Sequence, residues 1–404
     1  MTNEMRSKAR QLCGYAMVTL IIGSSLTACG KSAAAVATGE PSGGSSSALS
    51  TKSSSALSTK LSQYASVPTF NVPGPAFDAQ AAAKGKSVAI VPASSSIPFV
   101  QTIAQGMQAA GPKIGLGVTV LQNQGQTSQW AQAVGIATSQ HASSIDLLAG
   151  IDPALLGPQI AQAKSAGVGT VASHFYGVGQ TPAPALAGTV DAPYGVAGQL
   201  LADYAINKTN GKLNALVVTI NQVLSTAPMV DGIKKEVGTY CASTCKVTYT
   251  NASIANLATN VPTAVRGALQ RDPKINYIIA LYDSALVPYV LSGVESAGAT
   301  AKVKIVTFNG TPSILKLVAS GKVEMDVGEN LNWVALAILD QHLRLLAGLS
   351  PVANENLPLR IWDASNISQA GSPPQNSVGY GTSFVTGYQK LWKLPPGATL
   401  GGLG

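Results

Sequence analysis

The stretch Ser87–Pro92 reads SVAIVP, an apolar and β-branched run that predicts a buried strand. Residues 99–110 follow it with the periodicity of a helix, and the same pair of elements recurs along this half of the chain. Further strands are expected at residues 117–121, 145–150 and 168–172, and helices at 127–139 and 154–166. Short buried strands that alternate with helices form parallel crossovers, so this region predicts a doubly wound α/β lobe.

The pattern starts again after residue 188. Expected strands are 215–220, 245–250, 277–281, 304–308 and 324–328, and expected helices are 192–207, 227–240, 257–271, 284–297, 314–320 and 333–346. Two successive sets predict the fold class α/β, with two similar doubly wound parallel-sheet lobes. In such sheets ligands bind beyond the carboxyl ends of the strands, so the residues after each strand are the candidates for a site.

In the first half, hydroxyl, aromatic and imidazole side chains follow the expected strands. The candidates are Ser95, Ser96, Phe99, Gly150, His174 and Tyr176. One serine could simply cap the helix that follows, Phe99 could belong to the core, and a lone histidine is often structural. Their position at strand ends nevertheless favours a binding site.

The second half adds Tyr282 and Asp283 after one strand, Asn309 after the next and Glu329 after the last. Asp283 could also act as a helix cap. Polar edges with aromatic faces among them suit a small polyhydroxylated solute. We therefore expect these residues to lie on the rim of one cleft.

Catalytic signatures are missing from the sequence. It contains no nucleophile elbow, no HExxH, no P-loop and no Gly-rich dinucleotide fingerprint. We expect neither an enzyme nor a cofactor or metal site. The net charge of +8 comes from scattered basic residues rather than from a basic run, which argues against nucleic-acid binding.

The N-terminus predicts export. Residues 1–10 are basic and polar, residues 14–28 are apolar but too short to span a bilayer, and the run ends Leu-Thr-Ala-Cys at Cys29. The cut before a cysteine resembles the lipobox of bacterial lipoproteins. We therefore expect residues 1–28 to be a signal peptide, Cys29 to be lipidated, and the protein to be anchored outside the cytoplasm on the bacterial cell membrane. The alternative is a short membrane anchor with a coincidental cysteine.

Residues 29–67 are rich in Ser, Ala, Gly and Thr, and the octad SSSALSTK occurs twice, at 45–52 and 53–60. The spacing of Leu49 and Leu57 could indicate a helix, but the serine clusters argue against one. Because such a segment buries little apolar surface, we expect a flexible tether.

Cys241 and Cys245 stand close together in YCASTCK. Outside the cytoplasm a local disulfide is the expected state. The alternative is a metal site, for which two cysteines without histidine or carboxylate neighbours supply only half the ligands.

The motifs resemble those of the type 1 periplasmic sugar-binding proteins, ribose-type members in particular. The resemblance rests on residues 86–92 with 97–99, on KIVTFNGTP at 304–312, on SGKV at 320–323 and on the helix from Trp333, and it covers about residues 84–395. It implies crossovers near Val190, Asn330 and Leu357. The lobes would then be residues 68–190 plus 330–357 and residues 191–329 plus 358–404.

The resemblance also implies hinge closure around a small solute, delivery to the permease and ATPase of an ABC importer, and a monomeric protein. A ligand-sensing lipoprotein that signals to a membrane receptor would have the same fold. An extracellular enzyme is the weaker rival.

The departures from the ribose-type pattern concern the charged groups. His174 and Phe175 stand where that family has an Asp-Arg pair, and Met229 stands where it has a cleft arginine. Its Asn-Asp becomes Tyr282-Asp283, its Phe-Asp-Gly turn becomes Phe308-Asn309-Gly310, and its crossover glutamine becomes Glu329. Two strong clamps on hydroxyls are lost. We therefore predict that ribose, glucose and galactose are not the ligands, and that a polyol, a modified sugar, or an amine-bearing or partly aromatic solute is.

Overall fold

The computed structural model describes residues 49–400 together with residues 402 and 403. The expected signal peptide, Cys29 and most of the first octad lie outside the described residues. Among the described residues, no helix combines the length and apolar character that a membrane crossing requires.

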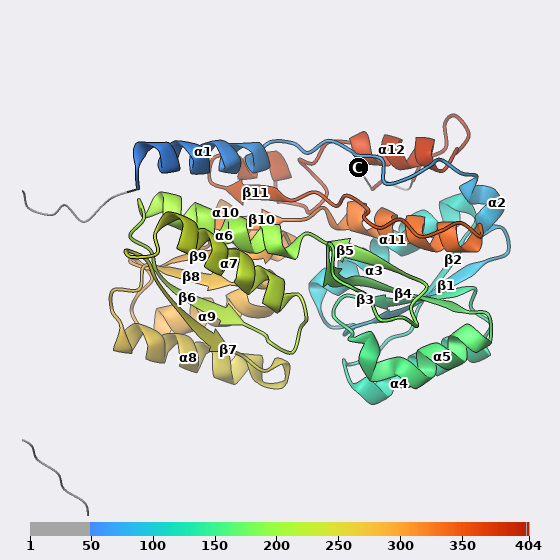
Figure 1. Ribbon diagram of the computed structural model, residues 1–404, viewed down its shortest axis with the longest axis horizontal. Coiled ribbons are helices and arrows are strands. Elements are labelled where there is room, and N and C mark those ends of the chain that lie inside the picture. Colours follow the sequence, from blue (N-terminus) through green and yellow to red (C-terminus); the bar gives the residue numbers. More distant parts are fainter. Residues whose placement is uncertain (1–48, 401, 404) are drawn as a thin grey trace, which may run out of the picture. The chain divides into compact units, whose positions relative to one another are not determined.

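The first lobe is built on a five-stranded sheet with the order β2-β1-β3-β4-β5, in which each described pair of neighbours is parallel (Figure 1). Its strands are β1 (Ser87–Pro92), β2 (Gly117–Val120), β3 (Ser144–Leu148), β4 (Gly169–Gly177) and β5 (Gly188–Ala192). Its helices are α2 (Ala79–Ala83), α3 (Pro98–Ala110), α4 (Thr127–Ser139), α5 (Gly157–Ser165) and α11 (Leu331–Leu346), with 3-10 turns η1 (Gly111–Ile114) and η2 (Pro153–Leu156).

Side chains of β1 show how the sheet is covered on both faces. Val88 and Ile90 belong to the core that contains α3 and α11, whereas Ala89 and Val91 belong to the core that contains α4 and α5. Successive residues of a strand point to opposite faces, so an uninterrupted apolar run is what a sheet between two helical layers needs.

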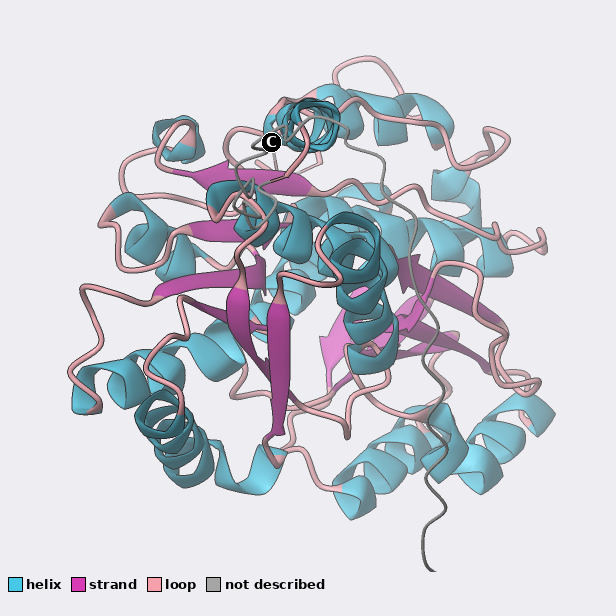
Figure 2. Cartoon of the chain, turned by 60° about the vertical axis from the view of Figure 1, so that its left-hand side comes forward, coloured by secondary structure: helices cyan, strands magenta, loops and turns pink. Residues whose placement is uncertain are grey.

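The second lobe has a six-stranded sheet with the order β11-β10-β9-β8-β6-β7. In Figure 2 its strands come forward, with helices on both sides. The strands are β6 (Asn214–Thr219), β7 (Lys246–Asn251), β8 (Tyr277–Ala280), β9 (Lys304–Asn309), β10 (Met325–Gly328) and β11 (Arg360–Asp363). The helices are α6 (Tyr194–Lys208), α7 (Thr226–Tyr240), α8 (Leu257–Arg271), α9 (Asp283–Ser296) and α10 (Pro312–Ala319), with 3-10 turns η3 (Ile254–Asn256) and η4 (Ile367–Ala370).

The predicted α/β architecture with two wound sheets is confirmed. Most expected elements lie within a few residues of the observed ones, and α4 and α8 have the expected bounds. Two strands were not expected. These are β5, at the edge of the first sheet, and β11, which pairs antiparallel with β10.

The flexible tether predicted up to residue 67 is wrong for residues 51–65, which form the helix α1 (Thr51–Ala65) on the second lobe, against α6 and β11 (Figure 1). Leu57 is fully buried, and Leu61 and Tyr64 pack against the same core. Spacings of four and three residues place these side chains on one helical face. The Ser50 hydroxyl accepts from the Ser53 amide, so a serine of the cluster starts the helix rather than preventing it.

Charged groups fix α1 as well. The Lys60 Nζ atom lies 2.7 Å from Asp203 Oδ2 and 3.7 Å from Glu236 Oε2. Asp203 is buried on α6 and Glu236 is buried on α7. The second octad thus contributes both an apolar and an ionic contact to the second lobe.

The chain then runs from α1 to the first lobe. Phe70 packs against Trp333 and Tyr388, with ring centroids 5.7 and 5.0 Å apart. The Pro75 carbonyl accepts from Arg344 Nη1 at 3.3 Å. Residues 66–69 therefore form a covalent link between the lobes in addition to the three crossovers.

Helix α12 (Ser383–Leu391) packs on α11, and Phe384 stacks on Trp333 at 4.8 Å and 9°. Residues 358–404 were all assigned to the second lobe from the sequence. The structure instead includes Leu400 and Leu403 in the core of the first lobe, because Trp333 and its neighbours leave an apolar face on α11 that the C-terminal segment covers.

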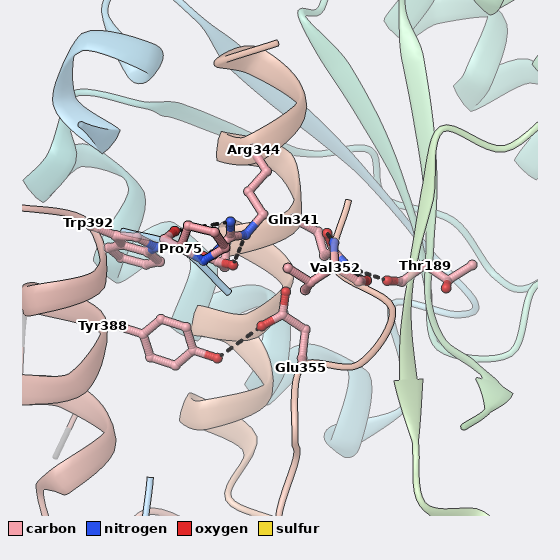
Figure 3. A network of polar contacts seen from close by, with 9 residues as sticks. Pro75, Thr189, Gln341, Arg344, Val352, Glu355, Tyr388 and Trp392 are labelled. Carbon is pink, nitrogen blue, oxygen red and sulfur yellow. Dashed lines mark hydrogen bonds and ion pairs between the residues drawn. The ribbon is translucent and has the colours of Figure 1, made fainter. Parts of the chain in front are cut away.

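A buried polar network holds the third crossover, residues 347–359, against α11 (Figure 3). Gln341 donates to the carbonyls of Thr189 and Val352 at 2.9 and 2.7 Å. Beside it, Tyr388 donates to Glu355 Oε2 at 3.4 Å, and Trp392 donates to Asp340, which also accepts from Arg344. Burial raises the pKa of the Asp340 carboxyl and of the Glu355 carboxyl.

Candidate functional site

His174 lies in an irregular part of β4, where the register with β5 shifts between Ser173 and Gly177. Its φ of 53° is in the left-handed region, which turns the side chain away from the regular sheet direction. The imidazole Nε2 lies 2.7 Å from Oε2 of Glu329. Since Glu329 follows β10 and precedes α11, this contact joins a strand of the first lobe to a crossover from the second.

Tyr194 is the other neighbour of His174. It begins α6, two residues after β5, and therefore stands on the first crossover. Its hydroxyl lies 2.7 Å from His174 Nδ1 and donates to the His174 carbonyl at 2.8 Å. Burial raises the pKa of Tyr194 well above its ordinary value, and the nearby Glu329 carboxylate raises it further.

Aromatic rings surround the imidazole. The Phe99 centroid lies 4.8 Å from that of His174, and Tyr194 meets His174 edge-on at 5.3 Å. Phe308, at the end of β9, lies 6.0 Å from Tyr194. A polar group flanked by two aromatic rings suits a small solute with polar edges and an apolar face.

The second lobe contributes hydroxyl groups at the start of α7. The Tyr282 hydroxyl lies 2.8 Å from both Ser225 Oγ and Thr226 Oγ1, and burial raises its pKa to about 12. The Ser225 hydroxyl lowers the pKa of Tyr194 as well as that of Tyr282. Ser225 therefore lies near the hydroxyls of both Tyr282 and Tyr194, and Tyr194 contacts His174.

Asp283 serves a turn. Its Oδ2 accepts from the Thr311 amide at 2.6 Å and also from the Thr311 hydroxyl. Its carboxyl is fully buried, and burial raises its pKa to about 6. Its Oδ1 accepts from the Ser284 amide. Because both carboxylate oxygens have donors, Asp283 fixes the turn after β9 rather than presenting a free carboxylate.

Asn309 and Gly310 form that turn with positive φ values of 138° and 76°. A Cβ on Gly310 would lie 2.7 Å from the Gly328 Cα, so the turn requires glycine there. Asn309 is 5% exposed and lies at the carboxyl end of β9, next to the end of β10. The turn therefore positions Asn309 beside the segment that carries Glu329.

Of the remaining predicted residues, Gly150, Ser95 and Ser96 lie in loops that follow strands, whereas Tyr176 and Met229 lie apart from the polar group. Gly150 lies between the lobes, since a Cβ built on it would be 3.9 Å from Val223 of the second lobe. Ser95 accepts from the Asn123 amide at 2.9 Å, and Ser96 pairs with Ser94. Both serines thus shape the loop after β1.

Tyr176 and Met229 lie apart from this polar group. The Tyr176 hydroxyl accepts from the Ala183 amide at 3.1 Å, within the β4–β5 connection. Met229 is fully buried in the core between α6 and α7, where its carbonyl sits against Gly198. The expectation that Met229 contacts solute therefore does not fit the structure, because the chain position that resembles the family's cleft arginine faces the helix interface.

Sequence reasoning missed Tyr194, Ser225 and Thr226. The rule of examining residues after strands would have found Tyr194 if β5 had been expected. Ser225 and Thr226 lie at the start of α7, the helix that follows β6. The same position, at the start of a helix after a strand, marked the serines after β1 as candidates.

Two surface hollows lie elsewhere. One, of 390 Å³, is lined by residues near Leu49 and by the segment from Gly238 to Thr244, and the other, of 500 Å³, lies between Phe70 and α12. At the strand ends, by contrast, His174, Asn309 and Glu329 are buried.

No group of three or more potential metal ligands occurs within residues 49–400. The Sγ atoms of Cys241 and Cys245 lie 2.08 Å apart and their Cα atoms 5.3 Å apart, which is disulfide geometry.

A family model described as "Periplasmic binding protein domain" matches residues 88–350. The search of curated proteins finds no match. Among solved structures, a glucose-galactose binding protein from Geobacillus stearothermophilus is 14% identical, with a TM-score of 0.61, covering 70% of this chain and 98% of that one. A solute-binding protein from Burkholderia graminis in complex with D-arabinose is 18% identical (TM-score 0.62, 71% and 98% covered). One from Agrobacterium vitis with bound allitol is 16% identical (TM-score 0.62, 70% and 97% covered).

Proposed function

Because the chain belongs to the periplasmic binding protein family, we propose that it is the extracytoplasmic solute-binding lipoprotein of an ABC importer. This is a family of binding proteins rather than enzymes. The proposed ligand is a small sugar-like or polyol-like solute, held between the lobes by hinge closure and delivered to a membrane permease that an ATPase drives.

The observation that carries this proposal is the contact between His174 and Glu329. It joins the end of β4 to the crossover after β10, and Tyr194 on the first crossover touches the same imidazole. A solute that reaches these groups contacts both lobes and their connections at once. Only contacts of that kind stabilise a closed state over an open one.

The chemistry of the site supports a sugar-like or polyol-like solute. The His174 imidazole lies beside the rings of Phe99 and Tyr194, and proteins of similar fold hold D-arabinose and allitol. No arginine is among the groups that touch His174 or Glu329 in the described structure. We therefore expect weak binding of plain ribose, glucose and galactose.

The anchoring proposal rests on the sequence. The apolar run that ends at Cys29 supports export, cleavage and lipidation, and residues 30–48 would then lead to α1. Outside the cytoplasm the Cys241–Cys245 pair would be oxidised. Labelling with a fatty-acid probe tests the anchor, and Cys29→Ala should abolish the label.

A thermal-shift screen of the mature chain against several hundred sugars, polyols and their derivatives tests the binding function. A solute that binds the folded state raises the melting temperature by mass action. The thermal shift of a hit should be smaller in Tyr194→Phe and unchanged in Tyr176→Phe. Uptake of that labelled solute by cells with and without the gene then distinguishes import from a sensing role, in which uptake would not change.

A further inference from the structure

We propose that the solute carries a protonated amine, and that this ammonium group takes the place of the His174 imidazole on the Glu329 carboxylate. The inference rests on the proposed function and narrows its ligand to amine-bearing sugars or amino alcohols.

Glu329 is a buried carboxyl group with unused bonding capacity. It is 1% exposed, and its Oε1 has no hydrogen-bond partner among the described residues. Its Oε2 has one partner, His174 Nε2. A buried carboxylate oxygen without a donor is costly. An ammonium group has three donors and can satisfy both oxygens together.

The hydroxyl of Tyr194 determines where protons lie on His174. It has one proton, which we assign to the His174 carbonyl, and with this assignment Nδ1 carries a proton of its own toward the same hydroxyl. The 2.7 Å contact between Nε2 and Oε2 needs a further proton. His174 and Glu329 therefore share one proton beyond that of a neutral imidazole beside a carboxylate.

The shared proton supplies the positive charge beside Glu329 that the ammonium group of a bound solute would supply instead. The only cationic group within ion-pair distance of Glu329 in the described structure is His174. The charge of Glu329 acts on Tyr194, Asp326 and Tyr380, and Arg360 acts on Tyr380 as well. Burial raises the pKa of the two tyrosines and of Asp326, so these three groups supply no positive charge for a phosphate or carboxylate, and the Glu329 carboxylate itself disfavours an anion and favours a cation.

Other carboxylates near the site are less suited to the amine. Asp283 is engaged by Thr311. Asp326 Oδ2 also has no partner among the described residues, but this carboxyl is 0% exposed beneath the turn, and burial raises its pKa well above the ordinary value. The rings of Phe99 and Tyr194, which flank His174, would also favour an ammonium group that enters beside them.

The exchange is balanced as a proton transfer. The ammonium binds Glu329, the shared proton leaves His174 for the buffer, and His174 keeps its Nδ1 proton as a neutral imidazole. Binding of the amine thus releases one proton, whereas binding of a neutral solute beside the intact pair releases none.

Calorimetry on the mature chain tests this with matched pairs: D-glucosamine and D-glucose, D-galactosamine and D-galactose, and 1-amino-1-deoxy-D-sorbitol and D-sorbitol. Each titration is run at pH 7 in phosphate and in MOPS, whose ionisation enthalpies differ and neither of which is a primary amine. At least one amine should bind about tenfold or more tightly than its parent, since charge-assisted bonds are the stronger ones. The buffer dependence should correspond to one released proton.

The variant Glu329→Gln should remove the preference for the amine, and Glu295→Gln, on the exposed face of α9, should keep it. The proton count uses the unmodified protein, so the test holds if Glu329→Gln does not fold. Parents that bind as tightly as their amines, or amine binding without proton release, would overturn the inference and leave the proposed function standing. If no amine, parent or other solute of the wider screen binds, the proposed function fails as well.

Discussion

The Nε2 atom of His174 lies 2.7 Å from Oε2 of Glu329, and this one contact connects the first sheet with the crossover that returns from the second. Tyr194, on another crossover, holds the opposite nitrogen of the same ring. Three segments thus meet at one imidazole, with Tyr194 20 positions and Glu329 155 positions from His174 along the chain. Any change in the angle between the lobes must alter this group.

Tyr194→Phe should weaken solute binding about tenfold and lower the free energy of unfolding by about 1 kcal/mol, because it removes a hydroxyl that contacts both His174 Nδ1 and the His174 carbonyl. Tyr176→Phe is the matched control, since the Tyr176 hydroxyl only accepts from Ala183. Titration calorimetry and urea unfolding measure the two effects. Equal losses of affinity in both variants would contradict the placement of the site.

Leu57→Ala should lower the free energy of unfolding by about 3 kcal/mol, because a fully buried leucine of α1 leaves a cavity against α6. Leu49 occupies the same place in the first octad and is only partly buried, so Leu49→Ala should cost clearly less. Urea unfolding of both variants measures the difference. Equal small effects would show that α1 does not dock in solution.

Lys60→Met should destabilise the protein more at pH 8 than at pH 5. Burial raises the pKa of Asp203 to about 7, so the folded state favours the protonated carboxyl, and this contribution to stability is lost as the pH rises from about 4 through about 7. Lys60 offsets that loss by pairing with the ionised form. Without Lys60, the decrease in the free energy of unfolding between pH 5 and pH 8 should be larger.

Lys52→Met provides the control for this measurement, because Lys52 holds the same octad position but is exposed on α1. Its unfolding free energy should follow the unmodified protein at both pH values. A Lys60→Met variant that shows the same pH dependence as Lys52→Met would argue against the buried ion pair.

His342→Ala should reduce stability by about 3 kcal/mol without changing solute affinity. His342 Nδ1 lies 2.8 Å from Ser144 Oγ, and its Nε2 lies 3.1 Å from Asp146 Oδ2. Serine, histidine and aspartate are the members of a hydrolytic triad, but all three are at most 1% exposed here. Their role is to satisfy buried polar groups between β3 and α11, and loss of one partner strands the others. An unfolding curve and one calorimetric titration check both statements.

The sequence predicted the fold well because apolar runs such as SVAIVP have few alternatives between two helical layers. It also located His174 and Glu329, since the strand-end rule depends only on the strands before them. Tyr194 was missed because β5 is short and half-buried, with Asp191 near its end, and does not form a clear apolar run. The resemblance could not predict which face of α7 carries Met229. That face depends on the close packing of α7 against α6 at Gly198 and Gly232. The docking of α1 depends on Asp203, about 140 positions away along the chain, which no local pattern reveals.

Hydrogen–deuterium exchange with and without the solute that gives the largest thermal shift tests the central claim most directly. The account predicts slower exchange in four segments, around His174, Tyr194, Ser225 and Glu329, with little change elsewhere. Protection confined to the hollow near Thr239 or to the groove beside Phe70, with these four segments unchanged, would contradict it.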